Sequence, residues 1–302
     1  MAKMKVIVNP AADRGQARQK AGALLALLAE KGLDFDVEHT NWPGEAIELA
    51  RAAVEAGYET VVALGGDGTS QEVINGLMQA PHTGLAGTLG VLPVGSGNDF
   101  AYGVGIPLNV ETAVEHLAAG QARVIDVGFV HVDGVPDRYF GNGVGIGFDA
   151  QVAIESTRVK RLRGFTMYFW ALLKTLLFHY QIPTLTVDDG QRVHTQPALL
   201  IAVSNGRRYA GGFLLTPQAR MDDGLFDVCL ADEMSRLKIL SFVPKAMQGT
   251  HIYEPEVTMA HATRVVVTSE DDLVAHGDGE ILCTAAHRLE MEIVPHSLRV
   301  IV

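Results

Sequence analysis

Cysteine is scarce in this chain of 302 residues, which contains only Cys229 and Cys283. Two isolated cysteines provide neither a disulfide framework nor the spacing of a cysteine metal site, as expected of a protein from a reducing compartment. Both are predicted to be small buried apolar residues. Long apolar runs are missing too. Residues 165–180 are interrupted by Lys174 and His179, well short of the ~20 apolar residues that a membrane-spanning helix needs.

Positive charge is also in deficit, since 24 Lys and Arg residues face 35 Asp and Glu residues for a net charge of −11. General nucleic-acid-binding domains are normally basic, so we expect no nucleic-acid partner. The N-terminus holds three consecutive apolar side chains, which predicts a first β-strand and no secretory signal. With 48% hydrophobic and 20% charged residues, the composition predicts a globular protein, and we expect it in the cytoplasm.

Strand and helix signals alternate through the first third of the sequence. This order predicts an α/β domain over residues 1–125, with a parallel sheet covered on both faces. Strands are predicted at 6–8, 34–39 and 61–64, and helices near 17–28, 47–54, 73–77 and 110–117.

Strand-like runs dominate the rest of the chain, separated by turn signals such as Asp278-Gly279. They predict a mainly antiparallel β-sandwich domain over residues 126–289, interrupted by helices near 151–180 and 235–248. Two domains are expected at this chain length, and residues 290–302 are predicted to return to the first one. The predicted strands are 124–132, 185–187, 199–203, 226–230, 264–268 and 289–293.

Two glycine-rich turns carry the clearest functional signal. The first, G-G-D-G-T, surrounds Asp67, and the second, G-S-G-N-D, covers residues 95–99. Backbone N–H groups beside a helix start bind anions, and a carboxylate fits there when a cation lies between it and the anion. Because ligands bind beyond the carboxyl ends of parallel strands, the two turns predict a site for a magnesium nucleotide. An ordinary strand-to-helix turn is the alternative for either one alone.

Two further nucleotide-binding patterns carry less weight. A P-loop is excluded, because the sequence contains no Gly-Lys pair. A loose G-x-G-x-x-A at Gly145, Gly147 and Ala150 lacks a clean strand-helix frame, so a Rossmann oxidoreductase is a weak alternative.

The segments V-A-L-G-G-D-G-T-S-Q-E-V-I-N-G and G-V-L-P-V-G-S-G-N-D-F-A resemble the diacylglycerol kinase catalytic domain family, especially its soluble bacterial lipid kinases. NAD kinases and phosphofructokinases share G-G-D-G-T, whereas G-S-G-N-D-F and the late D-G-E separate the lipid kinases from them. The resemblance implies a phosphofructokinase- or NAD kinase-like α/β domain followed by a β-sandwich. It covers nearly the whole chain, through N-P at 9–10, the threonine at 40, I-D-V-G at 125–128, M-D-D-G-L-F-D-V at 221–228 and H-G-D-G-E at 276–280.

The resemblance implies ATP and Mg²⁺ as cofactors, with Asp67 and Asp99 supporting the metal through water. A second, structural Mg²⁺ is implied at Asp223, with backbone oxygens of Arg220 and Leu225. From the residues alone, this segment fits an ordinary β-turn equally well. The implied nucleotide-site residues are Asn9, Thr40, Gly65, Gly66, Asp67, Gly68, Thr69, Ser70, Gln71, Ser96, Asn98 and Asp99.

Catalysis is implied at Asp278 and Glu280, which would supply the general base, with Asp126 close by to orient it. A lipid hydroxyl is a weak nucleophile, so a carboxylate must accept its proton as phosphorus is attacked. On an extended strand, two residues at this spacing would share a face, and the sequence does not assign the base between them. A solvated acidic turn is the alternative.

Residues 158–180 are the candidate lipid contact. Arg158, Lys160, Arg161 and Arg163 precede a helix rich in Phe, Trp and Leu, a pattern that suits an anionic membrane surface. A half-buried core helix shares the same pattern. We expect a lipid substrate and peripheral contact at the inner face of the membrane. The oligomeric state stays open, a homodimer included.

The sequence therefore predicts an ATP- and Mg²⁺-dependent kinase that phosphorylates a lipid hydroxyl. Diacylglycerol is the favoured acceptor, and phosphatidic acid would be the product. Catalysis is expected in the cleft between the two domains. Phosphatidylglycerol, monoacylglycerol, a ceramide or a sphingoid base could also be the acceptor, because acyl-chain pockets are generic apolar surface. Two alternatives have weaker support from the motifs than a lipid kinase: an NAD kinase-like enzyme, and a non-catalytic protein that binds nucleotide or lipid.

Overall fold

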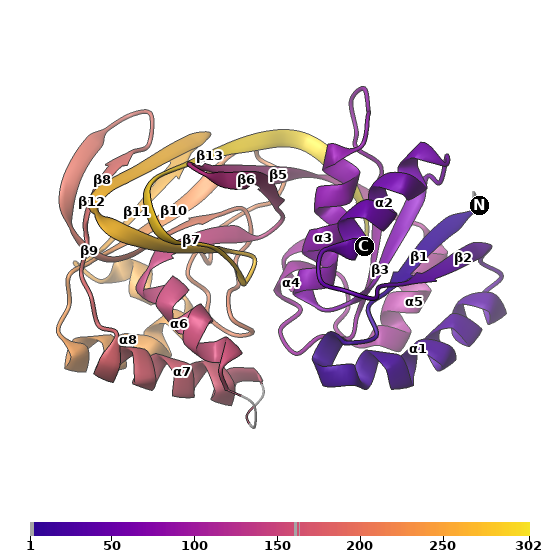
Figure 1. Ribbon diagram of the computed structural model, residues 1–302, viewed down its shortest axis with the longest axis horizontal. Coiled ribbons are helices and arrows are strands. Elements are labelled where there is room, and N and C mark those ends of the chain that lie inside the picture. Colours follow the sequence, from indigo (N-terminus) through magenta and orange to yellow (C-terminus); the bar gives the residue numbers. More distant parts are fainter. Residues whose placement is uncertain (1–2, 160–161, 163) are drawn as a thin grey trace. The chain divides into compact units, whose positions relative to one another are not determined.

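The computed structural model describes residues 3–159, 162 and 164–302 of the chain. The chain divides into two compact units (Figure 1). The N-terminal unit comprises residues 1–127 with 295–302, and the C-terminal unit comprises residues 128–294. Two long strands, β5 (Ala122–Val132) and β13 (Glu280–Ile301), contribute residues to both units.

The N-terminal unit contains a parallel sheet in the strand order β2-β1-β3-β4, and the end of β13 pairs with β4. Buried residues run almost without interruption through β3 and β4, the pattern of parallel strands that helices cover on both faces. The predicted α/β architecture is confirmed. Its elements are β1 (Met4–Val8), α1 (Ala12–Glu30), β2 (Phe35–His39), α2 (Glu45–Glu55), β3 (Thr60–Gly65), α3 (Asp67–Gln79), β4 (Thr88–Pro93), α4 (Asp99–Val104) and α5 (Val110–Ala119).

Helices cover this sheet in two layers. Helices α1 and α5 lie together on one face, and α2 and α3 lie together on the other (Figure 1). The buried side chains of α1 are Ala17, Ala21, Leu24 and Leu28, which recur at helical spacing and form one apolar stripe. The sheet is therefore covered by apolar helix faces, and its strand ends are left to the loops.

The chain reverses its direction across this sheet between β1 and β3. From β1 it crosses to β2 on one side, and from β3 it crosses to β4 on the other. Ligands of open α/β sheets bind beyond the carboxyl ends of the strands at such a topological switch point. Asn9 follows β1 there, and the G-G-D-G-T turn follows β3.

The C-terminal unit contains a mainly antiparallel sheet in the order β11-β10-β9-β7-β12-β13. Phe140 and Phe226 stack in its core with ring centroids 5.5 Å apart. The predicted antiparallel, β-rich architecture is confirmed. Its further elements are β6 (Val135–Phe140), β7 (Gly143–Gly147), α6 (Phe148–Thr157), α7 (Gly164–Phe178), β8 (Thr184–Asp188), β9 (Val193–Ser204), β10 (Phe226–Asp232), α8 (Arg236–Gln248), the 3₁₀ turn η1 (His251–Tyr253), β11 (Val257–Ala262) and β12 (Arg264–Gly277).

Helices α7 and α8 share one apolar cluster in this unit. Leu172 and Leu176 of α7 belong to it with Ile239, Phe242 and Val243 of α8, together with residues of β9 and β10. Figure 1 shows α6, α7 and α8 gathered along one face of the strands. The two helices therefore cover the same face of the C-terminal sheet.

The turn between β12 and β13 corrects one expectation from the sequence. Gly277 pairs with Glu280 across the hairpin, and the residues between them, Asp278 and Gly279, have φ values of 50° and 87°. A two-residue type I′ hairpin turn requires positive φ at both positions and favours Asp-Gly. The prediction that Asp278 and Glu280 share a face of one extended strand is therefore wrong.

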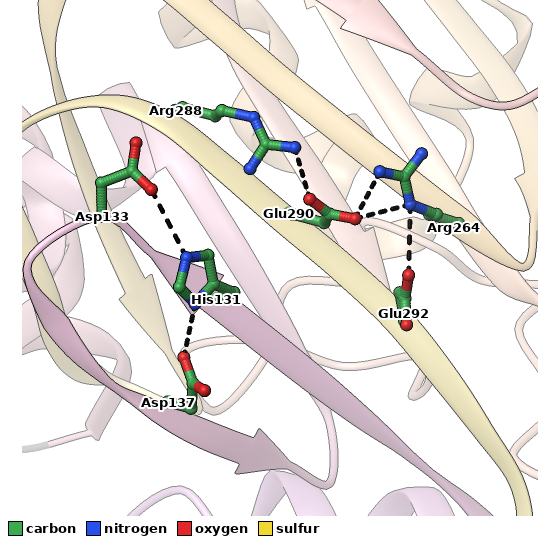
Figure 2. A network of polar contacts seen from close by, with 7 residues as sticks. All are labelled: His131, Asp133, Asp137, Arg264, Arg288, Glu290 and Glu292. Atoms are coloured by element: carbon green, nitrogen blue, oxygen red, sulfur yellow. Dashed lines mark hydrogen bonds and ion pairs between the residues drawn. The ribbon is translucent and has the colours of Figure 1, made fainter.

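Polar side chains connect neighbouring strands on the surface of the C-terminal unit (Figure 2). Arg264 of β12 forms an ion pair with Glu290 of β13, across the strand pair. In the β5–β6 hairpin, the His131 ring lies 2.6 Å from Asp137 and 3.4 Å from Asp133. These contacts stabilise strands at the surface and lie outside the predicted site residues.

Candidate active site

Asn9 connects the two strands at the switch point. Its backbone N–H donates to the carbonyl of Leu64 at 3.0 Å, and its side-chain Nδ2 donates to Thr69 Oγ1 at 3.0 Å. Thr40, after the neighbouring strand β2, is buried and donates its N–H to the carbonyl of Val8 at 2.9 Å. Three predicted nucleotide-site residues are thus held at the carboxyl edge of adjacent strands.

The two glycine-rich turns pack directly against each other. A Cβ atom built at Gly95 would lie 2.5 Å from Gly66 Cα, and one built at Gly66 would lie 3.1 Å from Gly95 Cα. The Val94 N–H donates to the carbonyl of Gly65 at 2.9 Å. Glycine is required for this backbone approach, so the structure brings both motifs together at one edge of the sheet.

Asn98 shapes the second turn from within. It has a left-handed φ of 55°, which asparagine tolerates better than most residues. Its Oδ1 accepts the N–H of Gly95 at 3.0 Å, and its Nδ2 donates to the carbonyl of Gly95 at 2.9 Å. Ser96, at the tip of the turn, is exposed. Asn98 therefore supports the loop, whereas Ser96 is accessible to solvent.

Asp67 and Asp99 start α3 and α4, the helices that follow the two turns. Asp67 Oδ1 accepts the N–H of Phe100 at 3.1 Å, which connects the first turn to the second helix. A Cβ atom built at Gly97 would lie 2.8 Å from Asp67 Oδ2 and 3.6 Å from Asp99 Oδ2, so both carboxylates border one glycine.

The carboxylates of Asp67 and Asp99 are suitable ligands for a hydrated Mg²⁺. Mg²⁺ in nucleotide sites keeps several waters and binds one or two carboxylates together with phosphate oxygens. Within the described residues, no group of three or more His, Cys, Asp or Glu side chains is arranged to hold a metal. The Asp67–Asp99 pair therefore fits a hydrated Mg²⁺ that is shared with a phosphate.

Gln71 is a buried polar residue whose side-chain amide is available to hydrogen-bond with a ligand. Its side chain is 1% exposed, and neither Nε2 nor Oε1 has a hydrogen-bond partner among the described residues. A buried polar group without partners destabilises a fold by about 1–3 kcal/mol. Gly68 lies in the first turn of α3, where the first helix N–H groups have no partner within the helix. The N–H of Ser70, one position before Gln71, already donates to the carbonyl of Gly66 at 3.1 Å.

Glu72 is a site residue that the sequence analysis did not identify. Its carboxylate accepts the N–H groups of Gly44 and Ala46 at 3.0 and 3.1 Å. These bonds cap α2 with a negative charge, which is favourable at a helix N-terminus, and they anchor the segment after Thr40 to α3. No local signal marks this role, because the partners lie 28 and 26 residues away along the chain.

In the C-terminal unit, Asp278 is held by the loop between β6 and β7. Its Oδ1 accepts the N–H groups of Asn142 at 3.0 Å and Gly143 at 2.8 Å, and its Oδ2 accepts the N–H of Gly141 at 2.8 Å. Convergent main-chain donors of this kind form an anion-binding nest. The orientation of the Asp278 carboxylate is therefore set by the backbone.

The two remaining predicted catalytic carboxylates have different surroundings. Glu280 pairs with Nη1 of Arg138 on β6 at 2.7 Å, and both side chains are 35% exposed. Asp126 is fully buried in the N-terminal unit and accepts the backbone N–H of His296 at 2.7 Å. Asp278 and Glu280 lie in the C-terminal unit. Each of the three carboxylates therefore contacts different residues: the β6–β7 loop for Asp278, Arg138 for Glu280 and His296 for Asp126.

A buried polar layer supports the Asp278 turn. The Gly279 N–H donates to His276 Nδ1 at 3.3 Å, and His276 Nε2 lies 3.4 Å from Asp149 Oδ2. The ring of Tyr209 meets the His276 ring edge-on. Burial raises the pKa of Tyr209 well above its usual value, so the hydroxyl stays protonated. The sequence analysis identified none of these supporting side chains.

Gly145 explains the loose glycine pattern near this layer. A Cβ atom there would lie 1.8 Å from Asp149 Oδ2 and 2.6 Å from His276 Nε2. The glycine thus makes room for the Asp149–His276 pair, and its role is packing beneath a turn. It was the one sequence signal that could have indicated this pair.

Asp223 lies in the turn before β10. Its Oδ1 accepts the N–H of Leu225 at 3.1 Å, while Arg220 Nε contacts Asp222 at 3.3 Å. Burial raises the pKa of the neighbouring Asp227, and the charge of Asp223 adds to that rise. The carboxylate oxygen suits Mg²⁺, but backbone oxygens would have to complete the shell, so the structural metal stays a prediction.

Helix α7 is half-buried. One side lies in the cluster shared with α8, whereas Trp170 and Leu177 on the other side are exposed. No helix in the described part of the chain is long and apolar enough to cross a membrane. The basic residues Lys160, Arg161 and Arg163 of the candidate lipid contact lie outside the described residues.

Two family models match the chain over most of its length. The diacylglycerol kinase catalytic domain matches residues 3–130, and the YegS C-terminal NAD kinase beta sandwich-like domain matches residues 142–302. The first of these covers both glycine-rich turns, and the second covers the Asp278 turn.

Known proteins resemble the chain along most or all of its length. A diacylglycerol kinase of Mycobacterium tuberculosis (strain CDC 1551 / Oshkosh) is 31% identical, covering 99% of this chain and 94% of its own. A Chromohalobacter salexigens protein described as "Probable lipid kinase YegS-like" is 37% identical over 254 residues, covering 83% of this chain and 79% of its own. The crystal structure of a Bacillus anthracis diacylglycerol kinase has the same fold, with a TM-score of 0.74 at 20% identity, and coverage of 99% and 96%.

Proposed function

The chain belongs to the diacylglycerol kinase catalytic domain family, and we propose that it is a lipid kinase that transfers the γ-phosphoryl group of ATP to diacylglycerol, forming phosphatidic acid. One observation carries the proposal. The Gly66 and Gly95 turns touch, and this contact brings Asp67 and Asp99 to the same glycine at the end of the N-terminal sheet. Acceptor lipids besides diacylglycerol stay open, because the geometry constrains the phosphate site and not the acyl chains.

The N-terminal unit binds the nucleotide. Backbone N–H groups at the start of α3 and in the second turn donate to phosphate oxygens. Thr69 Oγ1 accepts a hydrogen from Asn9, so its own hydroxyl hydrogen is directed elsewhere and is available to a phosphate. Asp67 and Asp99 would hold Mg²⁺, which would neutralise phosphate charge.

The C-terminal unit supplies the proton acceptor. As the lipid oxygen attacks the γ-phosphorus, the bond to the β–γ bridging oxygen breaks and the hydroxyl proton passes to Asp278 or Glu280. Asp278 is fixed by main-chain N–H groups, whereas Glu280 is paired with Arg138. Glu280→Gln keeps the size of the side chain and removes its basicity. A fall in kcat of about 100-fold or more would therefore assign the base to Glu280.

The assay uses ATP labelled at the γ-phosphate, Mg²⁺ and vesicles that contain dioleoylglycerol. We expect the label in phosphatidic acid, and parallel vesicles with monoacylglycerol, phosphatidylglycerol, ceramide or sphingosine rank the acceptors. Folded protein that labels none of these lipids in the presence of Mg²⁺ would contradict the proposal. NAD added without vesicles tests the NAD kinase alternative directly, since label in NADP would support it.

A lipid acceptor requires the enzyme to meet a membrane surface. The exposed Trp170 and Leu177 of α7 support the contact proposed for residues 158–180, because aromatic and aliphatic side chains on a helix beside basic residues bind the bilayer interface. We propose this helix as one peripheral contact with the membrane that holds the substrate.

A further inference from the structure

Helix α8 carries a second apolar stripe that faces solvent. Leu237 is 81% exposed, Leu240 is 38% exposed and Met247 is 37% exposed, and Pro244 between them is exposed too. The spacing of three, four and three residues places all four on one side of the helix. Solvent-facing apolar residues scattered singly need no explanation, but a stripe along a helix indicates a binding surface.

The opposite side of α8 is also apolar and lies in the core. Ile239, Phe242 and Val243 belong to the cluster that includes Leu172 and Leu176 of α7. Figure 1 shows α7 and α8 on the same face of the sheet. Both helices bury one side in the shared cluster, so their exposed residues, Trp170 and Leu177 of α7 and the apolar stripe of α8, lie on the remaining, solvent-facing sides.

Basic side chains lie near these exposed apolar residues. At 3.6 residues per turn, Arg236 lies directly beside the α8 stripe, and Lys238 and Lys245 lie on its other side beyond the exposed Ser241 and Gln248. Lys174 lies on the exposed side of α7. Neither α7 nor α8 contains an Asp or Glu, although the chain as a whole has a net charge of −11.

The lysines are anchored and still reach solvent. Lys245 pairs with Glu254 at 2.6 Å and Lys174 pairs with Glu155 at 2.8 Å, while the two lysine side chains remain 39% and 40% exposed. Lys238 pairs with Glu256. The lysine charges are thus partly balanced within the protein, so the apolar stripes should dominate binding and anionic headgroups should add a smaller attraction.

We propose that α8 is a second membrane-binding helix, and that the α7–α8 face docks on the surface of an anionic bilayer. The charge pattern favours this occupant, because exposed Leu and Trp on two helices that carry Lys and Arg but no Asp or Glu complement anionic headgroups and the acyl boundary beneath them. This docking proposal rests on the proposed function only for the reason to bind a membrane, which is access to a lipid substrate. The binding itself can be measured with vesicles, without ATP or turnover.

Vesicle sedimentation of the full chain tests the role of α8. Leu237→Glu should weaken binding to vesicles of phosphatidylcholine and phosphatidylglycerol about 10-fold or more, because it removes one Leu from the buried interface. Val193→Glu is the matched control. Val193 begins β9, outside both helices, and is 68% exposed, so this variant should bind as the wild type does. Equal binding by the two variants would overturn the proposal.

A fluorescence readout locates the contact. The chain has two tryptophans, Trp42 and Trp170, so Trp42→Phe leaves Trp170 on α7 as the reporter. Its emission should shift to shorter wavelength when vesicles are added, and Leu237→Glu should suppress the shift. An unchanged emission would overturn the proposal. So would a loss of self-association in Leu237→Glu with vesicle binding intact, because the face would then be an interface between copies of this chain.

Turnover separates this proposal from the proposed function. With a short-chain diacylglycerol dissolved below its micelle concentration, Leu237→Glu and the wild type should have equal kcat/KM, whereas with dioleoylglycerol in vesicles the variant should be about 10-fold slower. Vesicle binding through α8 without phosphorylation of any lipid would contradict the proposed function and leave the docking surface in place. Equal rates on vesicles would contradict the docking surface alone.

Discussion

At the residue scale, carboxylates of one chemical type have very different partners in this protein. Main-chain N–H groups of the loop between β6 and β7 hold Asp278, and the Arg138 guanidinium pairs with Glu280. Asp126 is fully buried, accepts the backbone N–H of His296 and lies 3.9 Å from the ring of that residue. Asp67 and Asp99 stand at helix N-termini around one glycine. The motifs predict which acids act in the site, but only the folded chain decides which atoms hold them.

Asp67→Asn should lower kcat for diacylglycerol phosphorylation about 100-fold or more, because it removes a negative charge that would support the metal. The amide oxygen can still accept the N–H of Phe100, so the melting temperature should stay close to that of the wild type. Asp34→Asn, an exposed position before β2, is the matched control and should keep full activity. An active, folded Asp67→Asn enzyme would rule out the metal-support role.

His131 should titrate above its usual pKa. Its hydrogen bond to Asp137, together with the charges of Asp137 and Asp133, raises the pKa of the imidazole. A raised pKa in the folded state means that the stabilisation is fully present below the unfolded pKa and is lost as pH rises through the folded pKa. NMR titration of the ring should show the rise, and Asp137→Asn should return the pKa toward its ordinary value. Asp272→Asn, beside His287, should leave the His131 curve unchanged.

At the element scale, local patterns predicted the regular structure and failed at one turn. Apolar periodicity was sufficient for α1, and β-branched runs were sufficient for β3. Asp278-Gly279 is a turn signal, and yet Asp278 and Glu280 were expected on one extended strand. The two expectations conflict, and the turn prevails because positive φ is easily adopted by Asp-Gly. An inference about strand faces holds only when no turn separates the residues.

We expect the Asp149–His276 pair to position the Asp278 turn. His276→Gln removes the imidazole acceptor of the Gly279 N–H and the contact with Asp149, so kcat should fall about 10-fold while KM for ATP stays constant. Asp149→Asn should have a similar effect. Because the residues act as one unit, the double variant should be little worse than either single one.

Two results would contradict this positioning role. Additive losses in the double-mutant cycle would show that the two side chains act separately. A fall in melting temperature with kcat unchanged would show that the pair supports the fold alone. His287→Gln, at an exposed histidine of the same β13, is the control and should change neither quantity.

At the scale of the whole molecule, each unit holds its own set of predicted site residues. The N-terminal unit follows a rule that can be applied from sequence alone, because strand, glycine turn and helix are contiguous and ligands bind at the carboxyl ends of parallel strands. The C-terminal site could not be predicted in the same way. Its supporting contacts join residues far apart in the chain, such as Asp278 with Asn142 and Arg138 with Glu280, and no local pattern encodes such pairs.

Nucleotide binding should therefore protect the N-terminal unit selectively. At 100 times its dissociation constant, a ligand that binds only the folded state stabilises it by about 2.7 kcal/mol. With a non-hydrolysable ATP analogue and Mg²⁺, amide hydrogen exchange should slow in residues 65–71 and 95–101, where the two turns touch, and stay unchanged in residues 184–204. Asp67→Asn or removal of Mg²⁺ by EDTA should abolish most of this protection. Protection confined to the C-terminal unit would mean that the nucleotide binds elsewhere, and the contact between the glycine turns would then be structural only.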